Sequence, residues 1–210
     1  MTIWDNIYKN YQNGGEAWAS LSEEIYPLFK QFLNQSNFKL KYVLDIGCGT
    51  GKYLKILQSN GFKINGIDSS KIAVEITKKI LNKNSVVLCV NMFEFEILKN
   101  KYALVISIST IHHGTKEQVQ NLINKIYNAL VDNGRIFITV PNLKSSKKWN
   151  TFFRDQKKIA KGVFVPLLGP EKGLPHSFYT KKEAQKLFSK FKNLKLDLDS
   201  HGRWVAQASK

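Results

Sequence analysis

Short apolar runs alternate with amphipathic segments along most of the chain. Five of the runs are too short to be buried helices and predict strands, at 42–46, 64–67, 86–90, 103–108 and 135–140. Helices are expected to begin between them, at Thr50, at Ser69 or Ser70, and at Thr115. This alternation predicts a doubly wound α/β fold with a mostly parallel sheet, because each parallel return needs a crossover that a helix provides.

A further helix and an insertion are expected outside this core. Ser20 and Glu23 fit a capping box. It would open a helix with apolar residues at helical spacing, namely Ile25, Leu28, Phe29 and Phe32. We expect one domain spanning 1–210, with an N-terminal helical cap at about 1–38 and an insertion at about 144–180 as a lid or substrate region.

The regular pattern loosens in this insertion. A basic helical piece is expected at 149–161, followed by a loop rich in Gly and Pro. Thr180 and Glu183 then form a capping box, and the alternation that begins at Leu194 predicts an antiparallel C-terminal hairpin.

Apolar runs, the N-terminal pattern and the cysteines indicate where in the cell the protein is expected. No run of about 18 apolar residues is present to span a bilayer, and the N-terminus lacks the layout of a signal peptide. We therefore expect a cytoplasmic protein without a membrane partner. Cys48 and Cys89 lack any metal-binding spacing, so two free thiols and no zinc are expected.

The net charge of +16 comes from 32 Lys and Arg against 16 Asp and Glu. Such a charge attracts nucleic acid if it gathers on one face. A lysine-rich composition with many Asn and Ile is also what a nucleotide-biased genome produces without any such partner.

The segment after the first predicted strand carries the clearest chemical signal. Asp45 precedes three glycines that open a helix and let the backbone pass close to a nucleotide-like ligand. The spacing differs from the G-x-G-x-x-G of dinucleotide-binding turns, and Asp45 would repel a pyrophosphate. The cationic amino group of S-adenosylmethionine would suit Asp45 instead. Asp68, about twenty residues on, can accept hydrogen bonds from ribose hydroxyls.

The segment 43–51 resembles the first motif of the class I S-adenosylmethionine-dependent methyltransferases, and 66–70 resembles their second. The resemblance extends over about 40–142, with 106–113 and 134–141 similar to the later motifs. It implies a seven-stranded sheet whose last strand is antiparallel, S-adenosylmethionine as cofactor and S-adenosylhomocysteine as product. The cofactor-binding residues expected from these motifs are Asp45, Gly47, Cys48, Gly49, Gly51, Asp68, Ser69, Asn91, Met92 and Ser109.

Two positions depart from the family pattern. Asn91 stands where relatives commonly carry an Asp near the adenine, and its amide oxygen can still accept a hydrogen bond from the adenine amino group. The Phe-Asp pair that usually opens the fourth strand is Tyr102-Ala103 here, so a charge that helps to support the pocket is absent.

The catalytic candidates are His112 and His113, which follow the fourth predicted strand at the edge where ligands of open α/β sheets collect. They are expected to act as a general base or only to line the pocket, because methyl transfer from a sulfonium needs an oriented nucleophile more than a strong base. The residues expected to contact the acceptor are Tyr8, Trp18, His176 and Tyr179. Packing of a lid onto the sheet is the alternative explanation for these aromatics.

The methyl acceptor stays open, and we slightly favour an unidentified small molecule. The segments 49–53, 106–108 with 112–113, 176–178 and 202–204 are similar to methyltransferases of tRNA wobble uridines. Together with the positive charge they make tRNA the alternative partner. The same pieces occur among small-molecule methyltransferases. A non-catalytic cofactor-binding scaffold is a second alternative, although its two acids would be costly to bury without a ligand.

Overall fold

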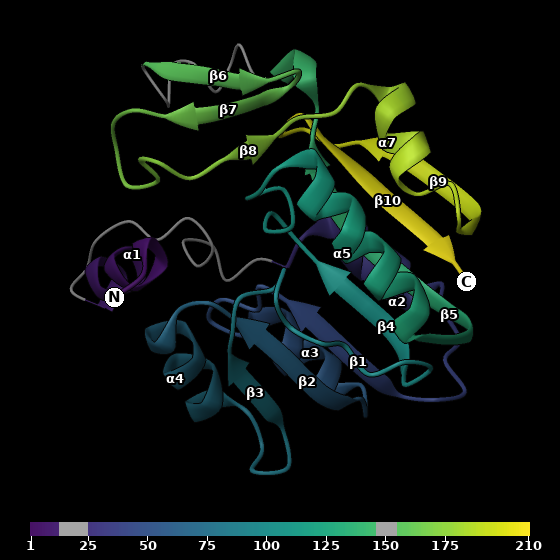
Figure 1. Ribbon diagram of the computed structural model, residues 1–210. Helices are drawn as coiled ribbons and strands as arrows, with labels where there is room; N and C mark the ends of the chain where they lie inside the picture. The colour runs from purple at the N-terminus through teal and green to yellow at the C-terminus, as the bar shows by residue number, and fades with distance from the viewer. Residues whose placement is uncertain (13–24, 146–154) are drawn as a thin grey trace.

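The computed structural model describes residues 1–12, 25–145 and 155–210 (Figure 1). Its α-helices are α1 (Ile3–Gln12), α2 (Pro27–Asn34), α3 (Lys52–Ser59), α4 (Lys71–Ile80), α5 (Lys116–Ala129) and α7 (Lys181–Leu187). The strands of the main sheet are β1 (Tyr42–Ile46), β2 (Lys63–Asp68), β3 (Val86–Cys89), β4 (Tyr102–Ser107), β5 (Leu130–Pro141), β9 (Lys192–Leu198) and β10 (Arg203–Ser209). A short 3₁₀ helix, η1 (Leu143–Ser145), follows β5.

Within the described residues, seven strands form the main sheet in the order β3-β2-β1-β4-β5-β10-β9. The first five strands in this order run parallel to one another, and β10 runs antiparallel to both β5 and β9. This arrangement confirms the doubly wound α/β fold and the antiparallel C-terminal hairpin. The predicted strands are all present, and β5 begins earlier than expected, at Leu130.

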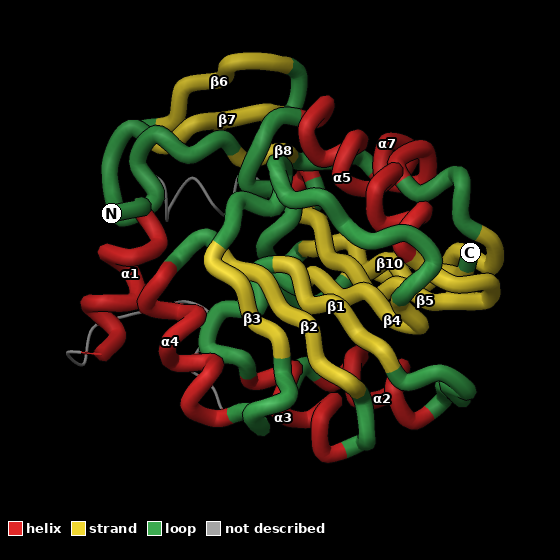
Figure 2. The backbone as a smooth tube through the Cα atoms, turned by 60° about the horizontal axis from the view of Figure 1, so that its bottom comes forward, coloured by secondary structure: helices red, strands yellow, loops and turns green. Residues whose placement is uncertain are grey.

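Helices cover both faces of the sheet (Figure 2). On one face, Phe29 of α2 and Leu54 of α3 share a core cluster with Phe137 of β5. On the other face, Ile126 of α5 and Phe188 join the second core cluster. Successive residues of a strand point to opposite faces, so the central strands contribute to both clusters, and β4 is buried along its whole length.

The predicted helix caps that fall on described residues are confirmed. Thr115 with Gln118, and Thr180 with Glu183, form complete capping boxes in which each side chain bonds the backbone amide of the other residue. Ser70 caps α4. None of the described helices is long and apolar enough to cross a lipid bilayer.

The helix α2 begins later than the predicted helix, at Pro27. Proline lacks an amide hydrogen, so it suits the first position of a helix and breaks a helix interior. Ile25 therefore lies before the helix, although its side chain is buried in the core. Ser20 and Glu23 lie outside the described residues, and their capping box stays a prediction.

The basic helix expected at 149–161 is wrong over the residues that are described. Here the chain forms β6 (Gln156–Ala160), which pairs antiparallel with β7 (Val163–Pro166). β7 in turn pairs with β8 (His176–Ser177) to give a second sheet of three strands in the described part of the chain. The backbone groups of β6 find their partners across this turn, which a local helical pattern does not reveal. Figure 1 shows this sheet and α1 beyond the carboxyl ends of the central strands.

Candidate active site

The glycine turn joins β1 to α3 at the carboxyl edge of the main sheet. The amides of Gly47 and Cys48 both donate to the carbonyl of Ile67 in β2, at 2.8 and 3.0 Å. A Cβ added to Gly47 would lie 2.1 Å from Cγ2 of Thr110, so any other residue here would require Thr110 to shift. The three glycines of the turn have positive φ angles of 75°, 54° and 80°, at Gly47, Gly49 and Gly51.

The first helix after the turn starts at Lys52 and not at the predicted Thr50. Gly51 adopts a left-handed conformation, with φ 80° and ψ 12°, which lies outside the helical region. The hydroxyl of Thr77 in α4 donates to the carbonyl of Gly49 at 2.7 Å. A neighbouring helix therefore fixes the shape of the turn from one side.

Asp45 is the buried acid of this turn, with 2% of its surface exposed. Among the described residues, its Oδ2 has no hydrogen-bond partner. Burial raises the pKa of Asp45 well above its ordinary value, and the nearby charge of Asp68 adds to the shift. A buried carboxyl with an unpartnered oxygen favours a ligand that carries a positive charge or a hydrogen-bond donor.

Asp68, at the end of β2, holds two backbone amides. Its Oδ2 accepts from Gly49 and its Oδ1 accepts from Ser70, each at 2.9 Å. Burial raises the pKa of Asp68, although these backbone hydrogen bonds oppose the shift. Each carboxylate oxygen can accept a second hydrogen bond, so the predicted ribose contact is compatible with this structural role. Ser69, which lies between Asp68 and Ser70 in the chain, is half-buried.

The helix α1 lies against this edge of the sheet (Figure 1). Asp5 accepts a hydrogen bond from the hydroxyl of Ser70 at 2.8 Å. Tyr8 is buried, and its pKa is raised first by burial and then by the charges of Asp68, Cys48 and Asp45. The structure thus brings the predicted Tyr8 beside both acids, whereas the predicted Trp18 lies outside the described residues.

Asn91 and Met92 follow β3, at the outer side of the site. The amide of Asn91 accepts from the backbone of Phe93 at 3.0 Å and donates to Glu94 at 3.1 Å. Met92 is half-buried and packs against the core. A hollow of about 380 Å³ opens here, lined by Val90, Asn91, Glu94, Phe95 and Glu96.

Ser109 lies in the turn after β4, where its φ of 59° is unusual for a residue with a side chain. Its amide donates to the hydroxyl of Thr139 at 2.7 Å, and its hydroxyl accepts from Arg203. Arg203 also donates from Nε to Asp199 at 2.7 Å. The start of β10 therefore holds the turn that carries the catalytic candidates.

Three histidines meet at the end of this turn. His112 and His113 come from the segment after β4, and His176 comes from β8. One ring nitrogen from each lies within 4.8 Å of the others. Burial, together with the neighbouring imidazoles, lowers the pKa of His112 well below its ordinary value and that of His113 to about 4. Both imidazoles are therefore neutral at pH 7.

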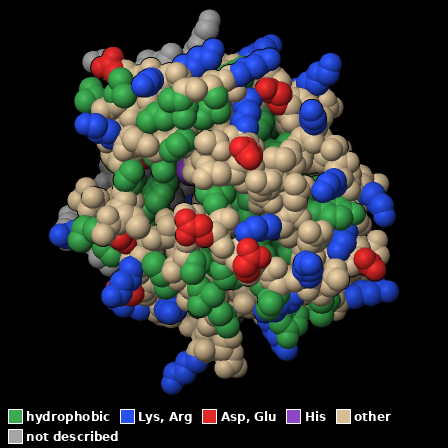
Figure 3. Space-filling model, in the orientation of Figure 1, with side chains coloured by type: hydrophobic (Ala, Val, Ile, Leu, Met, Phe, Trp, Pro, Cys, Tyr) green, Lys and Arg blue, Asp and Glu red, His purple; other side chains and the backbone are tan. Residues whose placement is uncertain are grey.

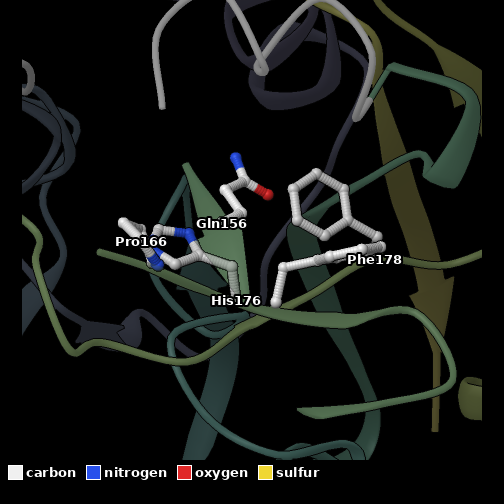
Figure 4. Close-up of a pocket in the computed structure, with 5 residues that line it drawn as sticks. Gln156, Pro166, His176 and Phe178 are labelled. Carbon is white, nitrogen blue, oxygen red and sulfur yellow. The ribbon is translucent and has the colours of Figure 1, made fainter. Parts of the chain in front are cut away.

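A buried carboxylate and an aromatic side chain border these histidines. Oε2 of Glu171 lies 3.1 Å from Nε2 of His176. Burial favours a raised pKa for Glu171, but the hydrogen bond with His176 holds it below its ordinary value. The ring of Trp4 in α1 packs edge-on against His113, with 4.9 Å between the ring centres. On its other side, His176 lines a small pocket with Gln156, Phe164, Pro166 and Phe178 (Figure 4).

Tyr179, predicted to contact the acceptor, lies within a hydrophobic core cluster. Its carbonyl accepts from the indole of Trp204 at 2.9 Å, and its amide donates to Pro141 of β5 at 2.9 Å. Burial raises the pKa of its phenol. These contacts attach the insertion to the main sheet.

Comparison with known proteins identifies the family. A family model described as a methyltransferase domain matches residues 18–193, which is most of the chain. The chain belongs to the class I S-adenosylmethionine-dependent methyltransferases. S-adenosylmethionine is the cofactor of this family, and the unpartnered oxygen of Asp45 beside the glycine turn fits its cationic amino group.

Curated relatives of this methyltransferase differ in what their names say they modify. A probable tRNA methyltransferase 9B of Mus musculus is 30% identical over 136 residues, which is 64% of this chain and 29% of the relative. A ubiquinone biosynthesis O-methyltransferase of Rickettsia conorii is 27% identical over 152 residues, covering 68% of this chain and 52% of the relative. The chain thus spans less than a third of the first relative and about half of the second.

A solved structure shows the same fold. The crystal structure of an S-adenosylmethionine-dependent methyltransferase from Methanosarcina mazei matches with a TM-score of 0.67 at 18% identity. The match covers 89% of this methyltransferase and 98% of the solved chain.

Three residues near the site were not predicted as site residues. Glu171 lies in a Gly/Pro loop without periodicity, and Arg203 is distant in sequence from the turn that it holds. Trp4 had a local signal, because it lies four residues before Tyr8 and so shares one face of an amphipathic helix with it.

Proposed function

We propose that this methyltransferase transfers the methyl group of S-adenosylmethionine to a small molecule bound beside His112 and His113. The burial of these two imidazoles, which are 2% and 9% exposed, is the observation that supports a small acceptor. An enclosed, largely preformed site suits a small molecule, whose surface it can cover.

The cofactor is held by residues at the carboxyl edge of β1, β2 and β3. Asp45 binds the cationic amino group, and the bare glycine turn allows the close approach of the backbone. Asp68 accepts hydrogen bonds from the ribose while it holds the amide of Gly49. Asn91 and Met92 border the adenine, where the hollow beside β3 gives support to this assignment.

The reaction is a direct displacement at the methyl carbon. The acceptor atom would form a bond to the methyl group as the bond from carbon to sulfur breaks, S-adenosylhomocysteine would be the leaving group, and the proton of the acceptor would pass to the imidazole that it is bonded to and then to solvent. The neutral imidazoles of His112 and His113 accept a hydrogen bond from the acceptor hydroxyl or amine and orient it toward the methyl group. His176 and Tyr8 form further walls, and the cap at about 1–38 with the insertion at about 144–180 acts as the lid.

A transfer assay tests the acceptor class. The protein is incubated with S-adenosylmethionine tritiated in its methyl group and with separated small-molecule and RNA fractions of a cell extract. We expect label in the small-molecule fraction, and a loss of transfer in His113→Ala without a change in cofactor affinity. His201→Ala, at an exposed histidine, is the matched control. Cofactor binding with no label in either fraction would favour the non-catalytic scaffold.

The second candidate acceptor is tRNA, including its wobble uridine. The name of the mouse relative favours it, as does the net charge of +16. Figure 3 shows Lys and Arg side chains over much of one face, and the exposed lysines at the β6–β7 hairpin include Lys157, Lys158 and Lys161. Lysines spread in this way bind phosphates without reading sequence.

The salt dependence of tRNA binding tests this candidate. Phosphate contacts release counterions, so affinity should fall steeply between about 50 and 200 mM salt and should weaken when the three hairpin lysines are changed to Glu. Label transferred to tRNA would replace the small-molecule proposal. A flat salt response would remove tRNA as the acceptor.

A further inference from the structure

The three histidines come from segments that are fixed to each other. The amide of Ser177 donates to the carbonyl of His112 at 2.9 Å, and its hydroxyl donates to the carbonyl of Gly114 at 2.7 Å. These bonds hold β8, which carries His176, against the turn that carries His112 and His113. The close approach of the three rings is therefore built into the backbone and does not depend on long flexible side chains.

Several nitrogens of this cluster are buried without a partner. Among the described residues, neither ring nitrogen of His112 has a hydrogen-bond partner, and Nδ1 of His113 also lacks one. Buried polar atoms in folded proteins nearly always have a partner in the protein, in water or in an ion.

Glu171 adds a negative charge to the same place. It is 6% exposed, and its Oε2 lies 3.1 Å from Nε2 of His176. A carboxylate beside a histidine cluster either binds the metal directly or accepts from a ligand imidazole and fixes its orientation. In both cases it offsets part of the charge of a buried dication.

We propose that His112, His113, His176 and Glu171 form a binding site for a divalent transition metal ion, with zinc as the first candidate. Three imidazoles are a donor set that suits zinc, and with Glu171 as the hydrogen-bond partner of His176 they leave a fourth position open for another ligand. Zinc holds nitrogen ligands at about 2.1 Å, which sets them about 3.4 Å apart in a tetrahedron. Binding would therefore draw the three ring nitrogens together from their separations of up to 4.8 Å. The cysteines, on which the expectation of no zinc was based, have no part in this site.

With a metal ion bound, the lone pairs of the imidazoles are on the ion, so the ion would take over from His112 and His113 in orienting the acceptor of the proposed reaction. A dication at the histidine cluster polarises an acceptor oxygen and favours loss of its proton. This consequence rests on the proposed function and points to acceptors with a hydroxyl group. Metal binding itself does not rest on the proposed function.

Metal binding is measured directly on the full chain. Protein freed of metal with a chelator is titrated with Co²⁺, followed by visible absorption, and with Zn²⁺, followed by calorimetry. We expect one ion per chain and absorption bands of a Co²⁺ site with nitrogen ligands. His176→Ala should abolish the bands, and Glu171→Gln should weaken binding about 10–100-fold. His201→Ala, at the exposed histidine outside the cluster, should bind as the unchanged protein does.

Two further readouts separate the possible outcomes. Zn²⁺ should raise the thermal midpoint of the unchanged protein and of His201→Ala, but not that of His176→Ala. No stoichiometric metal, or equal binding by His176→Ala, would overturn the site. The affinity for S-adenosylmethionine is measured in the same samples. If the unchanged protein binds metal but not S-adenosylmethionine, the result counts against the proposed function only.

Discussion

Asp45 is the residue whose substitution separates cofactor binding from folding. Asn keeps its size and removes its charge. Because Asp45 is buried and its Oδ2 has no partner in the described part of the chain, Asp45→Asn should leave stability unchanged or slightly higher. Its affinity for S-adenosylmethionine should fall by roughly 1.5–3 kcal/mol, about 10–100-fold. Calorimetry and thermal unfolding measure the two effects, with Asp132→Asn, at an exposed position, as the control. Unchanged affinity would show that Asp45 does not bind the amino group.

The same carboxyl makes cofactor affinity depend on pH. Burial and Asp68 raise the pKa of Asp45, whereas a bound cation favours its charged form. Binding therefore releases a proton wherever Asp45 is protonated in the free protein, and affinity should rise as pH increases above the ordinary carboxyl range toward neutral pH. The amino group of the cofactor has a pKa near 8 and stays charged over this range. Asp45→Asn should lose the dependence, and a flat profile in the unchanged protein would contradict it.

Gly47 and Gly169 form a matched pair for the packing of the glycine turn. Both have positive φ, 75° and 83°, so Ala at either position bears the same kind of backbone strain. A Cβ on Gly47 would meet Thr110 at 2.1 Å, whereas none of the described residues lies within 4 Å of one on Gly169. Gly169→Ala should cost about 1 kcal/mol of stability and Gly47→Ala at least about 2 kcal/mol more. Urea unfolding decides this, and equal costs would mean that Thr110 moves aside.

Among the elements, Glu183 joins α7 to α5 by an ion pair. Glu183 completes the capping box of α7 and bonds Lys116 of α5 at 2.7 Å. Burial favours a raised pKa, but the bonds to Lys116 and Thr180 lower the pKa of Glu183 to about 2. Since the folded pKa is lowered, its stabilisation is full above the ordinary carboxyl range and is lost as pH falls toward 2.

Glu183→Gln should therefore reduce stability by about 1 kcal/mol at pH 7 and by much less near pH 2. Glu117→Gln is the control, because Glu117 occupies the first turn of α5 and is exposed. Denaturant unfolding at both pH values gives the comparison. An equal cost at both pH values would show that the charge of Glu183 has no share in the effect.

Local sequence patterns predict some of the helices and strands correctly and others not. The capping boxes at Thr115 and Thr180 depend on residues three apart, so a local reading predicts them. The error at β6 (Gln156–Ala160) has a different origin, because its pairing with β7 depends on contacts across a turn. Pro27 is a local signal for the start of α2 that the apolar spacing outweighed.

For the whole molecule, the sequence predicts the individual parts of the site better than it predicts which of them lie close together. The glycine turn follows β1 and Asp68 ends β2. These two strands are adjacent and parallel, so their carboxyl ends lie side by side at one edge of the sheet. His112 and His176 were predicted independently, but the closeness of their rings follows from β8 packing on the turn after β4. Glu171 joins them from a loop without periodicity, so no local pattern marks it.

Calorimetric titration of the full chain with S-adenosylmethionine, S-adenosylhomocysteine and NAD tests cofactor use most directly. The buried acid and the glycine turn predict binding of the first two with one site per chain, and no binding of NAD, because Asp45 repels a pyrophosphate. Binding of NAD, or binding of none of the three by folded protein, would contradict the role assigned to this turn.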